Sequence, residues 1–186
     1  MRKIFVLMLS LSLFIPQAFA LKIGGIEMPD TLTVDSTSLV LNGAGLRKKF
    51  FVKVYAGGLY LKKKCSDPQK IIAADEPMAI RMHWTYDGVA SKKIVAGWNH
   101  GFQTGTGGKI QAIQKEIAKF NSYFSQEAIK NDIYEVIYQP GKGIDVQING
   151  KSKGFIPGLE FKKAVFGIWL GNNDELKSMK KGMLGN

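Results

Sequence analysis

An arginine stands just after a short glycine-rich stretch, where its guanidinium could bind an acid. The residues at 43–45 read Gly-Ala-Gly, they follow the hydrophobic run at 38–41, and Arg47 comes two residues after them. Glycines in such a place indicate a β-bulge or the close approach of another backbone segment. A guanidinium held on a sheet beside a hydrophobic cavity can bind both oxygens of a carboxylate. The residues alone favour the alternative, an exposed arginine in a turn beside two lysines.

The other side chains that could do chemistry form no recognisable constellation. His83 and His100 are the only histidines, and no spacing links them to a carboxylate as in a metal or haem site. The single cysteine, Cys65, excludes an internal disulfide and every zinc site that needs two thiolates. It follows the lysine run 62–64, which we interpret as a solvated strand edge, with a membrane-docking patch as the alternative. We expect no metal, no cofactor and no catalytic residue.

The glycine-rich sequence at 105–109 invites interpretation as a phosphate-binding loop. That motif needs a glycine where this chain has Gln103, and a serine or threonine where it has Ile110. The stretch also follows a predicted helix rather than a strand. A turn between two helices is therefore the better interpretation.

The first twenty residues have the pattern of a secretory signal peptide. Arg2 and Lys3 precede an apolar run at 4–15, and Ala-Phe-Ala at 18–20 matches a cleavage site. The alternative is an uncleaved anchor, but the run is shorter than the roughly 20 residues that a spanning helix needs. We expect export, to the periplasm if the source is a Gram-negative bacterium.

The chain carries a surplus of positive charge that indicates an anionic partner. Its formal net charge is +11, or +9 once the two basic residues of the leader are removed. Export argues against nucleic acid as that partner. The candidate partners that remain are an anionic membrane surface and a small carboxylic acid.

Residues 21–186 are expected to form a single domain of the α+β class. Period-two apolar patterns predict strands at 38–41, 50–61, 78–86, 133–138, 144–148 and near 154–156. Helical periodicity, with caps at several ends, predicts helices at 67–74, 88–102, 109–124, 159–170 and 174–182. Such an order of elements gives a sheet of meandering strands covered by helices from the middle and end of the chain.

Three blocks of sequence resemble the chalcone isomerase-like family. They are Leu-Asn-Gly-Ala-Gly-Leu-Arg at 41–47, the strand at 51–61, and Ala-Val-Phe-Gly-Ile-Trp-Leu-Gly at 164–171. The resemblance covers nearly the whole chain after the leader. It implies a curved, mainly antiparallel β-sheet packed against a layer of α-helices, with a ligand cleft between them.

The enzymes of that family cyclise a chalcone, and the resemblance carries over only one of their catalytic positions. Arg47 matches the arginine that steers the phenolate. Tyr55 stands where the enzymes have threonine, while Ala90 and Gly97 stand where they have tyrosine and asparagine. Those donors polarise the ketone. An intramolecular lyase or isomerase in the same cleft is therefore an alternative and not our main expectation.

The family's non-catalytic, fatty-acid-binding branch is similar to this chain at positions 47 and 55. There an arginine and a tyrosine hold the lipid carboxylate, and this chain has Arg47 and Tyr55 in that pattern. One extended strand would separate the two by roughly 26 Å, too far for one carboxylate to reach both. The hypothesis therefore needs a tight turn near residues 48–49.

We therefore expect an exported, non-catalytic binding protein for a fatty acid or a similar amphipathic carboxylate, held by Arg47 and Tyr55. The second alternative, beside the enzyme, is a structural or interaction protein of the cell envelope with a basic face. The sequence leaves the ligand and the oligomeric state open.

Overall fold

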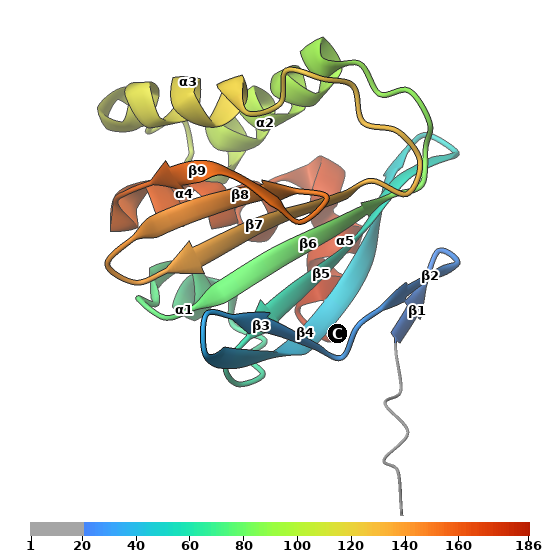
Figure 1. The fold of residues 1–186 in the computed structure, drawn as a ribbon, viewed down its shortest axis with the longest axis horizontal. Helices are drawn as coiled ribbons and strands as arrows, with labels where there is room; N and C mark the ends of the chain where they lie inside the picture. Colours follow the sequence, from blue (N-terminus) through green and yellow to red (C-terminus); the bar gives the residue numbers. More distant parts are fainter. Residues whose placement is uncertain (1–20) are drawn as a thin grey trace, which may run out of the picture.

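The computed structural model describes residues 21–186, so the expected leader lies outside the described residues. Seven strands form one antiparallel sheet in which each strand pairs with the next one along the chain (Figure 1). In order they are β3 (Thr31–Val34), β4 (Thr37–Lys49), β5 (Val52–Leu61), β6 (Met78–Trp84), β7 (Ile133–Gln139), β8 (Gly143–Ile148) and β9 (Lys151–Ile156). A separate hairpin, β1 (Leu21–Ile23) and β2 (Ile26–Met28), precedes them.

Helices come from the middle and the end of the chain, as the sequence predicts. They are α1 (Pro68–Ala73), α2 (Ser91–Gly105), α3 (Gln114–Ser122), α4 (Leu159–Leu170) and α5 (Lys177–Met183), with short 3₁₀ turns η1 (Gln111–Ile113) and η2 (Asp174–Leu176). Helix α4 packs against α2, and α5 lies along β4. The curved antiparallel sheet with its helical layer confirms the expected α+β class.

Both faces of the sheet are buried. Successive side chains of a strand point to opposite faces, and these strands carry apolar residues on both. In β5, Tyr55 and Leu59 join the large core under the helices, whereas Ala56 and Tyr60 join a smaller core on the opposite face. The hairpin β1–β2 covers that smaller core, to which it contributes Met28. The helix-covered face is the one that carries the candidate site.

Two local predictions are confirmed in the middle of the chain. Asp67 caps α1, since its Oδ1 accepts hydrogen bonds from the backbone N–H groups of Gln69 and Lys70 at 2.9 and 3.2 Å. Helix α2 ends at Gly105, and a turn at 106–108 follows it, in which Gly107 and Gly108 both have positive φ.

The link between β4 and β5 differs from the sequence prediction. Phe50 and Phe51 were expected to begin the second strand, but they form the turn, and Phe50 has φ of 54°. The tight turn thus comes two residues later than predicted. It folds β5 back along β4 and pairs Arg47 with Tyr55.

Candidate ligand-binding site

Arg47 and Tyr55 lie directly opposite each other on adjacent antiparallel strands. Residues so paired project to the same side of a sheet, with Cβ atoms about 5 Å apart. A β-bulge follows at once, because Lys48 pairs with Lys53 and leaves Val54 as the extra residue. Both side chains of the pair face the helices, where Arg47 meets η2 and Tyr55 meets α4.

The Arg47 guanidinium already binds a carboxylate of the chain. Its Nη2 lies 2.6 Å from Glu175 Oε2, and its Nη1 donates to the Glu175 backbone carbonyl at 3.0 Å. His100 of α2 approaches the other carboxylate oxygen at 3.7 Å. The hydrogen bond from Arg47 lowers the pKa of Glu175. The site therefore accommodates one carboxylate between a guanidinium and an imidazole.

The two glycines before Arg47 explain why Glu175 reaches it. A methyl group on Gly43 would meet the backbone oxygen of Gly182 at 2.2 Å, and one on Gly45 would meet that of Met179 at 2.5 Å. Only glycine lets α5 lie directly on β4, as the sequence suggested in predicting a close backbone approach. The η2 turn then places Glu175 over the end of the strand.

Tyr55 is buried, and its hydroxyl accepts a hydrogen bond from the indole Nε1 of Trp169 at 3.1 Å. Burial raises the pKa of Tyr55, against the smaller lowering effects of that hydrogen bond and of Arg47. The phenol is thus neutral at physiological pH. Its own proton remains available for an acceptor such as a carboxylate oxygen.

Tyr55 belongs to a closed ring of aromatic side chains, which we call the aromatic ring cluster. Successive members have ring centroids 5.3–5.8 Å apart, and the Trp169–Tyr55 hydrogen bond closes the circle. The members are Tyr55, Trp84, Tyr134, Phe124, Trp98 and Trp169. The indole Nε1 atoms of Trp84 and Trp98 are buried without a hydrogen-bond partner among the described residues. Unpartnered buried donors of this kind are uncommon in proteins.

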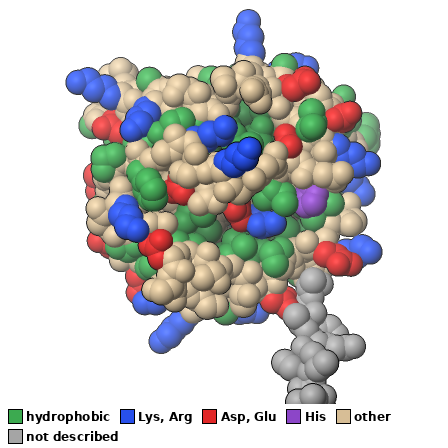
Figure 2. Space-filling model, viewed as in Figure 1, with side chains coloured by type: hydrophobic (Ala, Val, Ile, Leu, Met, Phe, Trp, Pro, Cys, Tyr) green, Lys and Arg blue, Asp and Glu red, His purple; other side chains and the backbone are tan. Residues whose placement is uncertain are grey.

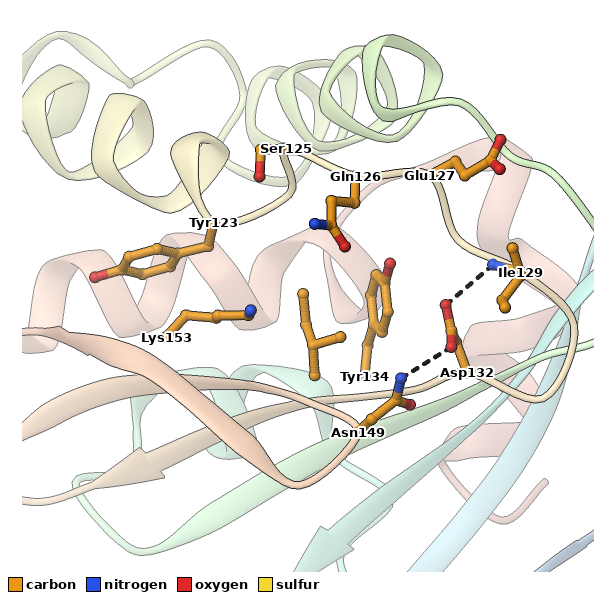
Figure 3. A pocket seen from close by; sticks show the side chains of 10 residues that line it. Tyr123, Ser125, Gln126, Glu127, Ile129, Asp132, Tyr134, Asn149 and Lys153 are labelled. Atoms are coloured by element: carbon orange, nitrogen blue, oxygen red, sulfur yellow. Dashed lines mark hydrogen bonds between the residues drawn. The ribbon is translucent and has the colours of Figure 1, made fainter.

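A hollow lies beyond this cluster, and Arg47 is not among the residues that line it. It has a volume of about 470 Å³ and is bounded by the loop before β7 and by β7, β8 and β9 (Figure 3). Tyr134 lines it, and burial raises the pKa of that tyrosine to about 12. Asp132 accepts hydrogen bonds from the Asn149 side chain and the Ile129 backbone, which fixes the loop (Figure 3). Tyr134 and Trp84 thus separate this cavity from Tyr55.

Most of the remaining sequence candidates lie away from Arg47. His83 contacts Asn131 at 3.4 Å. Cys65 is half-buried, and the exposed lysines at 62–64 line a smaller hollow of about 250 Å³ beside α1. Within residues 21–186 no three metal-ligating side chains cluster, and no helix there is long and apolar enough to cross a bilayer.

The structure also adds residues that the sequence did not single out for this site. The sequence predicts an ordinary histidine at His100, and no local signal identifies Glu175, because its partner Arg47 lies 128 residues away. Ala90 and Gly97 bring no polar side chain, and a methyl group on Gly97 would enter open space. The donors that a chalcone ketone would need are therefore missing at these positions.

On one face of the molecule, basic side chains lie scattered among other residues instead of forming one patch (Figure 2). On the face shown in Figure 2, several of them lie next to acidic side chains. Among the described residues, Arg81 pairs with Glu135 and Lys142 pairs with Asp35. The positive surplus thus identifies no binding face by itself.

The comparison with protein families finds a match that spans residues 20–185, to the model described as chalcone isomerase-like. The chain belongs to the chalcone isomerase-like family. No curated protein sequence matches it. Among solved structures, it is similar to the crystal structure of a fatty-acid binding protein from Arabidopsis thaliana. That likeness has a TM-score of 0.69 at 18% identity and covers 87% of this chain and 93% of the plant protein. It supports the chalcone isomerase-like fold.

Proposed function

We propose that this chalcone isomerase-like protein is an exported, non-catalytic binding protein for a fatty acid or a similar amphipathic carboxylate. The observation that supports it best is the pairing of Arg47 with Tyr55 across β4 and β5, on the face covered by helices. The plant protein with the same fold, which is described as fatty-acid binding, agrees with this class of ligand.

The ligand carboxylate takes the place that Glu175 occupies on Arg47. The Arg47 side chain is 20% exposed, whereas the Glu175 side chain is 57% exposed. Moving the glutamate into water therefore leaves no buried charge behind, because the incoming carboxylate replaces it on Arg47. Tyr55 donates its hydroxyl proton to the second carboxylate oxygen.

The hydrocarbon tail packs against the aromatic ring cluster. Trp84 stands next to Tyr55 in the register of the sheet, and Tyr134 leads on to the cavity behind it. The aromatic ring cluster offers the tail a large apolar surface, whereas the cavity beyond Tyr134 is lined mostly by polar side chains.

Displacement of a fluorescent fatty acid tests this function. Arg47→Ala should weaken binding about tenfold to a hundredfold, the value of a lost hydrogen-bonded charge. Arg81→Gln is the matched control, because it removes an arginine and its ion pair from elsewhere in the same sheet. Equal affinity of the Arg47 variant and the wild type would remove Arg47 from the site.

Two further measurements address export and catalysis. Amino-terminal sequencing of the protein recovered from the producing cells should begin at Leu21. A chalcone mixed with the protein should keep its absorbance, since Ala90 and Gly97 supply no donor for the ketone. Turnover that Arg47→Ala abolishes would instead support the isomerase alternative.

A further inference from the structure

The turn between β4 and β5 exposes two phenylalanines to solvent. Phe50 is 88% exposed and Phe51 is 100% exposed, and Val52 beside them is 43% exposed. We call these three residues the apolar tip. Tight hairpin turns usually carry Gly, Asn or Asp, and Phe50 adopts a left-handed backbone that β-turns reserve for such residues. Aromatic side chains held outward on a turn indicate a surface that meets an apolar partner.

Positive charge surrounds the apolar tip. Lys48 and Lys49 precede it and Lys53 follows it, and all three are exposed. None of them forms an ion pair with a carboxylate of residues 21–186. Glu175 is near enough for Lys49 to lower its pKa, but it binds Arg47. The tip therefore combines apolar side chains with uncompensated lysines.

Two neighbouring loops extend the apolar character of this end of the sheet. The backbone N–H groups of Thr85 and Tyr86 donate to the carbonyl of Val54, which ties the loop after β6 to the hairpin. Tyr86 is 47% exposed, and Ile129, on the loop before β7, is 48% exposed. These loops converge with the hairpin turn at the right of Figure 1.

The acidic groups at this end are engaged by the loops that carry them. Asp87 accepts from the Lys130 backbone, and Asp132 accepts from the Ile129 backbone. Glu127 lines the cavity together with Ile129, and its carboxylate lies near Gly88 in the loop after β6. The apolar tip itself is thus bordered only by lysines along the chain.

We propose that the apolar tip inserts into the interfacial layer of an anionic lipid bilayer while Lys48, Lys49 and Lys53 bind the lipid headgroups. The aromatic rings enter the region between headgroups and acyl chains, and the lysine stems lie along it with their ammonium groups outside. A second copy of the chain fits less well, because the two sets of lysines would repel each other. Anionic lipid complements the same charges.

This docking would bring the candidate site close to the bilayer. Arg47 lies near the end of β4, three residues before Phe50 in the turn, a distance of at most about 10 Å along the chain. The proposal does not depend on the fatty-acid function, because vesicle binding is measured without added fatty acid.

Sedimentation with vesicles tests the docking. We expect binding to vesicles of phosphatidylcholine with phosphatidylglycerol, weaker binding to phosphatidylcholine alone, and loss of binding at high salt. Replacing Phe50 and Phe51 by serine should weaken binding about tenfold for each ring buried. Changing Lys48, Lys49 and Lys53 to glutamine should weaken it about fivefold for each lysine.

Matched controls remove the same groups elsewhere. Phe155→Ser deletes a phenylalanine that is 37% exposed on β9. Glutamine at positions 62–64 removes the same three charges from the other lysine cluster. Both controls should bind vesicles like the wild type, and all proteins are prepared with the same N-terminus. If the control variants lost as much vesicle binding as the tip variants, the proposal would be overturned, since the binding would then not depend on the apolar tip and its lysines.

Two further results decide the matter independently of affinity. Phe51→Trp should keep vesicle binding and show a blue shift of tryptophan emission when vesicles are added, since tryptophan favours the interface. Failure of this emission to shift would contradict insertion. Sedimentation equilibrium gives the oligomeric state. An oligomer that dissociates when Phe50 and Phe51 are substituted would show that the tip is a protein interface and would overturn the lipid proposal.

Discussion

Replacing Glu175 by glutamine removes the negative charge that Arg47 binds within the chain. The variant keeps the size and shape of the side chain, so η2 and α5 should stay in place. If a ligand carboxylate must displace Glu175, this change removes its competitor. The affinity for a fatty acid should then rise.

The size of the gain follows from the exposure of the pair. Glu175 is 57% exposed and Arg47 is 20% exposed, so the ion pair belongs to the partly solvated class. Such pairs contribute about 0.2–1 kcal/mol, and the short distance of 2.6 Å places this one toward the upper end. Removing the competitor should therefore tighten binding by about twofold to fivefold.

Displacement of a fluorescent fatty acid measures the effect, and the chain offers a close control. Glu160 forms an equally short ion pair with Lys163 on α4, at 2.6 Å. Glu160→Gln makes the same change in charge but should leave the affinity unaltered. Equal affinities for the two variants, or weaker binding by Glu175→Gln, would refute the displacement of Glu175.

Three other predictions concern the parts of the fold that support the site. Gly45→Ala should destabilise the protein by about 1–3 kcal/mol in urea unfolding, because its methyl group has no room against Met179, whereas Gly97→Ala on α2 should be neutral or stabilising. A larger loss of stability in Gly97→Ala than in Gly45→Ala would contradict the packing of α5 on β4. Lys162→Met should lower the free energy of unfolding by about 2 kcal/mol, because the buried Lys162 ammonium donates hydrogen bonds to three backbone carbonyls at the end of α1. The neighbouring Lys163→Met should have little effect on stability, and an equal loss of stability in both variants would refute this role of Lys162. Because the pKa of Glu175 is lowered, the stability that its ion pair adds is present above pH 4.5 and lost as the pH falls further. The difference in unfolding free energy between wild type and Glu175→Gln should shrink accordingly in acid, and a constant difference would show that the charge is not its source.

The sequence predicts the elements well because apolar periodicity and capping are local signals. Asp67 before Pro68 identifies the start of α1, and the glycines at 43 and 45 indicate a close approach that α5 then makes. The resemblance to the fatty-acid-binding branch predicts that Arg47 and Tyr55 lie together. The tight turn that this requires is present, and the two residues pair across β4 and β5.

The errors and omissions have a physical cause as well. Phe50 and Phe51 look like the start of a strand, because propensity favours aromatic residues there and nothing local indicates a turn. Their exposure at the hairpin turn goes against the usual chemistry of turns, and such departures are expected at functional surfaces. Glu175 and His100 could not be linked to Arg47 from sequence, because only the docking of α5 and α2 brings them together.

The most direct test of the central claim is a crystal structure of the protein with a bound fatty acid. We predict that the ligand carboxylate lies within hydrogen-bond distance of Arg47 and Tyr55, that Glu175 has turned away, and that the tail lies against Trp84. An intact ion pair between Arg47 and Glu175, with the fatty acid seated elsewhere, would contradict the account.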